Sequence, residues 1–496
     1  MPIRLSDLLA ERGRTAPHGD YLIDARTHRR IDNRTMASAS TRWAAELDAL
    51  GTAAGDRVLI DIDDPLTFAV THLSVISAGR CAAPIDPLAP EAEVERSVRA
   101  IRPALILTDR GSRRGTPVSV STGMPATPLA DGPADSSGPG SAALLTSGST
   151  GVPKTVELGE RQLLHVAAAV VRHHRLGPAD RGFNPLPLFH INAQVVGLLA
   201  TWLSGASLVL DRRFHRTGFW PLLAEHDVTW LNAVPAILSV LSRDEQAAPP
   251  GRMRFIRSAS APLPWTVRGS IAELTGLPVV ESYGMTEAAS QITATPLDEP
   301  ARAGSVGRPV DVELTVIDRS GQPCPPGVVG RVRIRGNGVI TSYADGAAAD
   351  RFDQDRWLDT ADLGHLDEEG YLYLAGRADD VVNRGGELVY PREIEEVLLG
   401  DDAVLEAVVV GRPHDILGAV PVACVRTEGE LDEEEAATLV QRLMARCTQR
   451  LARYKRPAEV IVVGAFPLGP TGKVRRTELR RQVADQRLVP SMRRLS

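Results

Sequence analysis

Hydrophobic and polar positions follow two kinds of pattern between residues 8 and 108. Segments 8–12 and 43–50 have patterns typical of helices. Segments 57–62 and 105–108 are short apolar runs typical of buried strands. Strands that alternate with helices predict an α/β architecture with mostly parallel pairing.

The pattern changes further along the chain. Residues 111–140 are rich in Gly, Pro, Ser and Thr and predict a surface loop. Residues 195–245 return to an α/β pattern, with a strand expected at 228–231 and a helix at 235–242. Between 310 and 376, period-two segments at 313–318 and 330–335 flank a turn-rich stretch, and 371–374 predicts one more strand. This region therefore predicts a β-rich subdomain.

A smaller α/β pattern begins after Gly376. Pro391 suits the first turn of a helix through Leu399, because that turn needs no N–H from it. A strand is expected at 407–410 and a helix at 433–451. We therefore predict a boundary near Asp379. Residues 1–378 would form an N-terminal domain of two α/β subdomains and one β-rich subdomain, and residues 379–496 a small α+β domain.

Composition narrows the class of protein. The net charge of −6 gives no electrostatic reason to expect nucleic-acid binding. No apolar run approaches the roughly 18 to 20 residues of a membrane helix, and the N-terminal segment is charged and amphipathic, unlike a signal peptide. The four cysteines are far apart, which argues against a disulfide framework or zinc site. We expect a cytoplasmic protein with no membrane insertion.

Lysine is unusually rare. Of 56 basic residues only three are lysine, namely Lys154, Lys455 and Lys473. A solvated surface position accepts either basic residue, whereas a site that needs a compact ammonium does not accept the planar guanidinium. Each remaining lysine is therefore a candidate for chemistry, with chance survival as the alternative.

A loop suited to phosphate follows the apolar run 142–145. It reads SGSTGVPKT from Ser147 to Thr155, and its hydroxyls, glycine N–H groups and lysine charge are all donors for phosphate oxygens. It differs from the P-loop pattern G-x-x-x-x-G-K-[ST] at Pro153, which has no N–H to donate. An ordinary flexible turn is the alternative.

Three further loops carry groups suited to a nucleotide. In ESYGMTE (281–287) Tyr283 can stack on a purine, Thr286 can donate to phosphate and Glu287 can hold Mg²⁺. In 357–380, Asp362 can accept both ribose hydroxyls, with Arg377 nearby in the fold. GPTGKV (469–474) presents Lys473 on a glycine turn. Singly, these could be a surface ion pair and a plain turn; four such loops in one chain favour a nucleotide site.

Together these motifs resemble the adenylate-forming superfamily, which includes acyl-CoA synthetases, luciferase and peptide-synthetase adenylation domains. The motifs TSGSTGVPK, PLFH, YGMTE, TADLG, GRADD, YPREIEE, YKRP and PTGK follow that family's order and spacing over nearly the whole chain. NAVPAIL, RFIRSASAPLP and GSVGRPV look most like oxalate-CoA ligases and related short- and medium-chain acyl-CoA synthetases.

The resemblance implies a role for each motif. Thr286 would touch the α-phosphate, Glu287 would ligate Mg²⁺, and Lys473 would bridge the substrate carboxylate and the α-phosphate. Asp379 would be the hinge of a mobile C-terminal domain, and His190 would lie where the acyl pocket meets the thiol tunnel, a core histidine being the alternative. The remaining ATP-binding residues would be Thr146, Ser147, Gly148, Ser149, Thr150, Gly151, Lys154, Tyr283, Asp362 and Arg377. The acyl pocket would include Asn192, Gln194, Ser258, Ser260, Gly284 and Ser290, and the coenzyme A tunnel Gly385 and Gly386.

The implied reaction has two steps. A carboxylate attacks the α-phosphorus of ATP and releases pyrophosphate, and coenzyme A then takes the acyl group from the adenylate. The first step needs positive charge rather than a general base, because the carboxylate is already ionised at neutral pH. Leu388 departs from the Lys or Gln of many members, and Ser290 from the histidine of oxalate-CoA ligases. The polar pocket residues favour a functionalised acid.

Three alternatives remain open at this point. The acceptor could be an acyl carrier protein thiol or a nitrogen nucleophile instead of coenzyme A. The chain could be a phosphotransferase with a variant P-loop, or a non-catalytic relative, although Glu287 and Lys473 favour catalysis.

Overall fold

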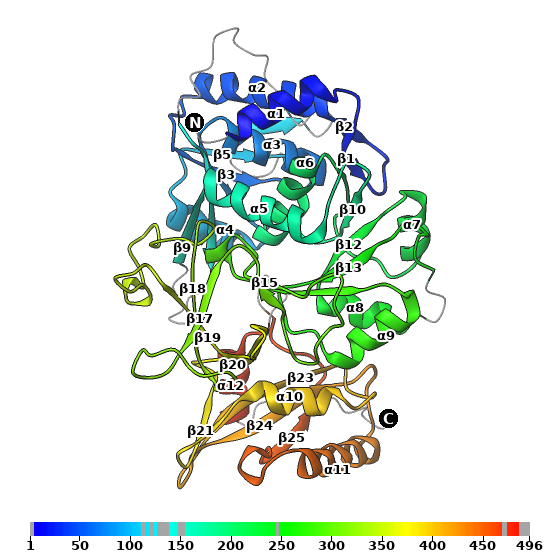
Figure 1. Cartoon of the computed structure of the whole chain (residues 1–496), viewed down its shortest axis with the longest axis vertical. Coiled ribbons are helices and arrows are strands. Elements are labelled where there is room, and N and C mark those ends of the chain that lie inside the picture. The colour runs from blue at the N-terminus through cyan, green and yellow to red at the C-terminus, as the bar shows by residue number, and fades with distance from the viewer. Residues whose placement is uncertain are drawn as a thin grey trace.

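Four β-sheets organise the chain in the computed structural model, which describes residues 4–110, 116–119, 124–125, 138–146, 154–244, 248–468 and 474–485. Two large sheets lie in the N-terminal part, a four-stranded sheet follows, and a five-stranded sheet lies in the C-terminal part. In Figure 1 the blue and cyan N-terminal helices lie at one end and the orange and red C-terminal elements at the other. The predicted α/β class is confirmed.

The seven-stranded sheet has the order β7-β6-β5-β3-β4-β8-β9. Its bounds are β3 (Arg57–Asp61), β4 (Cys81–Pro84), β5 (Leu105–Thr108), β6 (Thr116–Ser119), β7 (Met124–Pro125), β8 (Ser141–Thr146) and β9 (Lys154–Gly159). Strands β6 and β7 lie inside 111–140, so the prediction of a continuous loop there was wrong. Pairing with β5 gives β6 a strand conformation in spite of its turn-like composition, and β7 in turn pairs with β6.

The nine-stranded sheet has the order β16-β15-β14-β13-β12-β10-β11-β1-β2 and is parallel through its centre. Its bounds are β1 (Asp20–Asp24), β2 (Arg30–Asp32), β10 (Arg181–Asn184), β11 (Ser207–Leu210), β12 (Trp230–Ala233), β13 (Phe255–Ser258), β14 (Val279–Tyr283), β15 (Thr293–Ala294) and β16 (Arg308–Pro309). The strand expected at 228–231 instead begins at Trp230, where parallel pairing with Phe255 begins.

Helices cover both large sheets. Every residue of α3 is buried, and this helix contacts β1 of one sheet and β3 and β4 of the other. A helix that is buried on every side and mostly apolar belongs in such a position between two layers. The helices of this part are α1 (Leu5–Thr15), α2 (Asn33–Ala49), α3 (Pro65–Ser77), α4 (Glu91–Ile101), α5 (Glu160–His174), α6 (Ala200–Ser204), α7 (Phe219–Glu225), α8 (Pro235–Leu241) and α9 (Trp265–Thr275), with a π-helix at Ala193–Leu199 and a 3-10 turn at Thr286–Ala288.

The region between the large sheets and the C-terminal part is an antiparallel four-stranded sheet, as its period-two pattern predicts. Its order is β17-β18-β19-β20. Its bounds are β17 (Glu313–Ile317), β18 (Gly330–Arg335), β19 (Leu358–Leu366) and β20 (Leu372–Arg377), with a 3-10 turn at Ala349–Arg351. Strand β20 continues three residues beyond the expected 371–374, because it pairs with β19 as far as Asp362.

The C-terminal sheet is covered on both faces. Val409 and Val425 pack with α10 and α11, whereas Val408 and Val422 pack with α12. Alternate side chains of a strand point to opposite faces, so both sets are buried. The elements are β21 (Val382–Arg384), β22 (Glu387–Val389), α10 (Pro391–Leu399), β23 (Glu406–His414), β24 (Gly418–Arg426), α11 (Glu433–Arg450), a 3-10 turn (Arg453–Lys455), β25 (Glu459–Val462) and α12 (Arg476–Ala484).

The C-terminal elements meet the nine-stranded sheet near α9. Thr266 Oγ1 donates to the Leu399 carbonyl at 3.5 Å. Nearby, Glu281 on β14 is buried, and its Oε1 accepts from Leu263 N at 3.4 Å. Burial raises the pKa of the Glu281 carboxyl to about 7, although Arg392 of α10 and Arg268 of α9 oppose the shift.

This carboxyl is expected to make stability fall as pH rises from about 4.5 to 7. In that window the unfolded chain has lost the Glu281 proton while the folded protein retains it. The free energy of unfolding is therefore lower at pH 7 than at pH 4.5, by about 2 to 3 kcal/mol. The Glu281→Gln variant lacks this term, so its stability relative to the wild type should increase across the window and level off above it. Denaturant unfolding at a series of pH values measures the difference; a difference independent of pH would contradict the assignment.

Candidate active site

Asp362 and Arg377 face each other on neighbouring strands β19 and β20. Arg377 Nη1 lies 3.4 Å from Asp362 Oδ1, and Tyr283 donates its hydroxyl to Asp362 Oδ2 at 2.5 Å. Burial raises the pKa of Asp362, and the Arg377 charge opposes that shift. Burial and the Asp362 charge also raise the pKa of Tyr283, so the phenol remains a donor. The YGMTE, TADLG and GRADD motifs therefore meet at one carboxylate.

A bulge in β19 directs Asp362. The register shifts between Arg331 and Arg333 on the neighbouring strand, and Ala361 has a positive φ of 61°. Ala361 N donates to Asp359 Oδ1 at 2.8 Å, and Asp362 N donates to Thr360 Oγ1 at 3.1 Å. A bulge re-aims the side chains that follow it, and here local side chains satisfy its backbone groups.

Glu287 is held by two residues that the sequence motifs did not indicate. Tyr343 donates to Glu287 Oε1 at 2.7 Å, and Arg351 Nη1 lies 3.3 Å from the same oxygen. Arg351 also donates to the Tyr343 hydroxyl and, through Nε and Nη2, to the Asp359 carbonyl. Lys154 Nζ lies 5.3 Å from the centroid of the Tyr343 ring. Tyr343 thus connects the phosphate-loop lysine with the candidate metal ligand.

These contacts are compatible with a Mg²⁺ ion. Both partners of Glu287 use Oε1, and within the described residues Oε2 has no hydrogen-bond partner. No group of three His, Cys, Asp or Glu residues in the described part could hold a metal. Mg²⁺ commonly uses one or two carboxylates together with substrate phosphates and water, so a single buried carboxylate fits that mode.

The phosphate loop connects two antiparallel strands. Thr146 ends β8 and pairs with Lys154, which begins β9. The predicted loop residues Ser147, Gly148, Ser149, Thr150 and Gly151, with Pro153, lie outside the described residues. In a P-loop a helix begins at this lysine, whereas a strand begins here. The phosphotransferase alternative is therefore disfavoured by the fold as well as by Pro153.

The buried Asn192 lies beside the exposed Ser260, at the edge of a buried polar cluster. Asn192 Nδ2 is 3.5 Å from Ser260 Oγ, and Asn192 Oδ1 accepts from the buried Arg257. Of the other predicted pocket residues, Gln194, Ser258 and Ser290 are buried, and Gln194 donates to the Leu188 carbonyl. A Cβ on Gly284 would lie 1.5 Å from the Ser290 carbonyl oxygen, so this position requires glycine. His190 is half-buried, with its ring 4.3 Å from that of Phe189.

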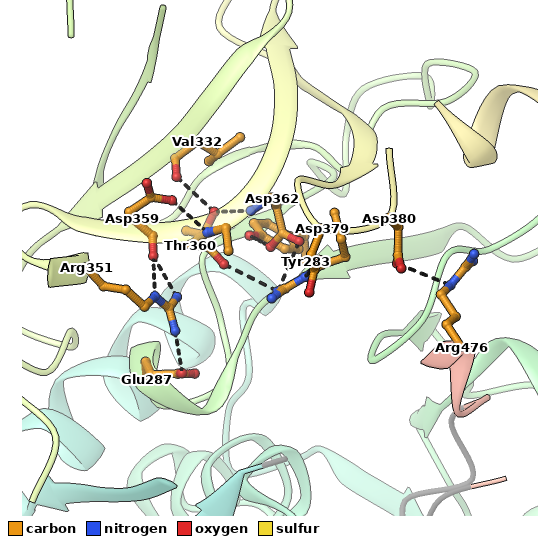
Figure 2. A network of polar contacts seen from close by, with 12 residues as sticks. Tyr283, Glu287, Val332, Arg351, Asp359, Thr360, Asp362, Asp379, Asp380 and Arg476 are labelled. Atoms are coloured by element: carbon orange, nitrogen blue, oxygen red, sulfur yellow. Dashed lines mark hydrogen bonds and ion pairs between the residues drawn. The ribbon is translucent and has the colours of Figure 1, made fainter. Parts of the chain in front are cut away.

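Asp379 and Asp380 lie between the four-stranded and the C-terminal sheets. Asp379 Oδ1 is 3.6 Å from Arg377 Nε. Asp380 is 3.5 Å from Arg476 at the start of α12. Figure 2 shows the polar contacts of the site, which run from Glu287 through Arg351, Asp359 and Thr360 to Asp362. Asp379 and the Asp380–Arg476 ion pair lie on the far side of Asp362 in the same view.

Lys473 lies outside the described residues, although its neighbours Leu468 and Val474 form an isolated antiparallel bridge. Gly385 and Gly386 have φ values of 64° and 95° and form the tight turn between β21 and β22. Two successive positive φ values are the geometry of a type I′ hairpin turn. This turn is by itself a sufficient reason for glycine at both positions. Their predicted place along a coenzyme A tunnel remains a prediction.

Two family models match this chain. The model described as AMP-binding enzyme matches residues 9–344, and the model described as AMP-binding enzyme C-terminal domain matches residues 393–473. The chain belongs to the AMP-binding enzyme family. The resemblance seen in the motifs is thereby confirmed. The two matched segments of this AMP-binding enzyme include Lys154, Glu287 and Lys473, whereas Asp362 and Arg377 lie between them, in 345–392.

Individual relatives agree with the family models. The AMP-binding enzyme is 36% identical to a sulfoacetate–CoA ligase of Cupriavidus necator, over 96% of this chain and 97% of the relative. It is 31% identical to an oxalate–CoA ligase of Arabidopsis thaliana, over 91% and 92%. Among solved structures, o-succinylbenzoate CoA synthetase of Bacillus subtilis with an acyl-adenylate intermediate superposes with a TM-score of 0.84, at 28% identity, over 95% and 97%. The same synthetase has been solved with ATP and a magnesium ion.

Among its described residues, the AMP-binding enzyme contains no helix that combines the length and the apolar character needed to span a bilayer.

Proposed function

We propose that this protein is an AMP-forming acyl-CoA ligase that activates a small carboxylic acid with ATP and transfers the acyl group to coenzyme A. The observation that carries the proposal is the meeting of Lys154, Tyr343 and Glu287 beside the Asp362–Arg377 pair. Relatives that are named CoA ligases over nearly their full length support the class of reaction. They favour coenzyme A over a carrier-protein thiol as acceptor.

In this proposal each site residue has a separate role in the first step, the formation of the acyl-adenylate. Asp362 and Arg377 hold the ribose, with Tyr283 against the adenine. Lys154 and the loop from Thr146 hold the departing pyrophosphate, Thr286 contacts the α-phosphate, and Glu287 holds Mg²⁺. The ion supplies positive charge where the negative charge of the transition state develops. Lys473 supplies a second cation there, between the substrate carboxylate and the α-phosphate.

The second step requires the lysine to withdraw and the thiol to enter. We propose that residues 379–496 turn about Asp379, which lies at the end of β20 and before β21. Rotation of a small domain about one or a few backbone positions is a common mechanism for such a change. In this reading Gly385 and Gly386 line the path of the thiol, and His190 lies where that path reaches the acyl pocket.

Acid-dependent exchange of labelled pyrophosphate into ATP tests the first step, with a panel of short acids as substrates. Loss of free coenzyme A thiol together with AMP release tests the second step. Exchange and AMP release are both expected to require Mg²⁺ and an acid. Formation of ADP instead of AMP, or no exchange with any acid, would refute the proposal.

The ribose assignment makes a separate prediction. The Asp362→Asn variant is expected to raise KM for ATP about 10- to 100-fold, because it loses charge-assisted hydrogen bonds worth about 1.5 to 3 kcal/mol. KM for the acid should change little. Asp367→Asn is the matched control, since Asp367 follows the same strand but pairs with Arg302 at 2.9 Å. Equal effects of the two substitutions in steady-state kinetics would contradict the assignment.

A further inference from the structure

A buried arginine without a carboxylate partner lies behind the candidate acyl pocket. Arg257, on β13, is 0% exposed. Within the described residues its guanidinium contacts only neutral amide oxygens, those of Asn192 at 3.1 Å, Asn232 at 3.0 Å and Gln291 at 3.4 Å. Arg80, the other fully buried arginine among the largest core side chains, forms an ion pair with Asp48.

An unpaired charge in this position is costly to the folded state. Taking an ion out of water costs several kcal/mol unless opposite charge or many hydrogen bonds replace the solvent. Burial lowers the pKa of Arg257 to about 9, which still leaves the guanidinium charged at neutral pH. Its Nε has no hydrogen-bond partner among the described residues. The local arrangement therefore holds a positive charge that no carboxylate among the described residues neutralises.

The arginine determines which way the Asn192 amide points. Asn192 Oδ1 accepts from Arg257 Nη1 at 3.1 Å and from Asn232 Nδ2 at 3.2 Å. With its oxygen occupied on the buried side, the amide turns its NH₂ group toward Ser260 Oγ, 3.5 Å away. Ser260 is exposed and has a φ of 78°, a conformation uncommon for serine and enriched at functional sites.

We propose that the Arg257–Asn192 pair makes this enzyme select short acids that carry a second anionic group, a carboxylate or a sulfonate. The inference rests on the proposed function and specifies the class of its substrate. Asn192 Nδ2 and Ser260 Oγ donate hydrogen bonds to the second anion, and Arg257 supplies positive potential from behind them. Arg257 is a positioning residue, because it acts through Asn192. Because Arg257 is fully buried and water does not screen it, its charge remains effective over the few ångströms involved.

Kinetics of Arg257→Met and Arg257→Lys against two classes of acid test this role. The first class contains oxalate, malonate, succinate and sulfoacetate, and the second contains acetate, propionate and butyrate. The wild type should prefer a member of the first class, and comparison within it separates carboxylate from sulfonate. Arg257→Met should lower kcat/KM for that acid about 100-fold, mainly through KM, as expected when a buried charge partner is removed. Arg257→Lys should restore part of the loss, and KM for ATP should remain unchanged.

Arg80→Met is the matched control for loss of a buried guanidinium. It should lower the thermal midpoint without changing the ratio of kcat/KM between the two classes. Asn192→Asp is a second variant of nearly the same volume, in which the new carboxylate pairs with Arg257 and repels the second anion. It should reduce use of dianionic acids even if Arg257→Met does not fold.

Three results would overturn the inference. These are a wild type that prefers acids of the second class, an Arg257→Met variant that loses both classes equally, and an Asn192→Asp variant with unchanged selectivity. Each of them leaves the proposed ligase function intact. Absence of pyrophosphate exchange with every acid would instead refute the proposed function itself.

Discussion

The Lys473→Ala variant is expected to catalyse acid-dependent pyrophosphate exchange about 100- to 1,000-fold more slowly than the wild type. This is the range seen when one preorganised hydrogen-bond donor to a transition state is removed. The ammonium would lie between two anions, the substrate carboxylate and the α-phosphate, which approach each other in the first step. Lys473→Arg should restore little, since a planar fork differs in shape and reach from a compact ammonium.

The second step separates this role from a general loss of folding. In our proposal Lys473 withdraws before the thiol enters, so the variant should still form acyl-CoA when it is supplied with the chemically prepared acyl-adenylate and coenzyme A. Lys455→Ala is the matched control, because Lys455 lies in the same C-terminal part and forms an ion pair with Glu393. It should retain exchange within a few-fold. Full exchange in Lys473→Ala, or equal loss in both variants, would contradict the assignment.

The Glu287→Gln variant is expected to lower kcat by about 100-fold or more and to raise the Mg²⁺ concentration needed for half-maximal rate. The substitution preserves the volume of this buried side chain but removes the negative charge that would hold the ion. Titration of the rate with Mg²⁺ at saturating ATP measures both effects.

Tyr343→Phe is the control for this prediction. It removes the hydroxyl that donates to Glu287 Oε1 but leaves the carboxylate charge in place. Loss of one hydrogen bond to a charged group is worth about 1.5 to 3 kcal/mol, which corresponds to about 10- to 100-fold in rate. The Mg²⁺ concentration needed for half-maximal rate should nevertheless stay near that of the wild type, because the carboxylate charge remains. If Glu287→Gln shows the same Mg²⁺ dependence as the wild type, Glu287 is not the metal ligand.

Elements with self-contained signals could be predicted from the sequence. The helix from Pro391 to Leu399 begins and ends as expected, and so do the strands from Glu313 and Gly330 within one residue. A missing N–H at the first helical turn and a period-two pattern act over a few residues, so neither depends on the rest of the fold. Strand boundaries were less predictable, as at Trp230, where β12 begins two residues later than expected. A strand begins and ends where its pairing with a neighbour begins and ends.

The same distinction applies to the site. Glu287, Asp362 and Arg377 were recognisable because they stand in motifs of suitable composition, and the structure brings Asp362 and Arg377 together on neighbouring strands. Tyr343 and Arg351 stand in a segment without such a composition. Their contacts with Glu287 join residues 56 and 64 positions apart, and no local pattern indicates them.

The sequence by itself determined the class of protein and the kind of chemistry, through the order of its loops and the retention of three lysines. Only the tertiary structure decided which groups meet, such as Lys154 with Tyr343 and Arg257 with Asn192. The physical reason is one of range. Hydrogen-bonding capacity, charge and backbone preference belong to a residue and its near neighbours. The distance between two side chains far apart in the chain depends on sheet register and helix packing over whole domains, and the partners of a buried charge follow from that packing.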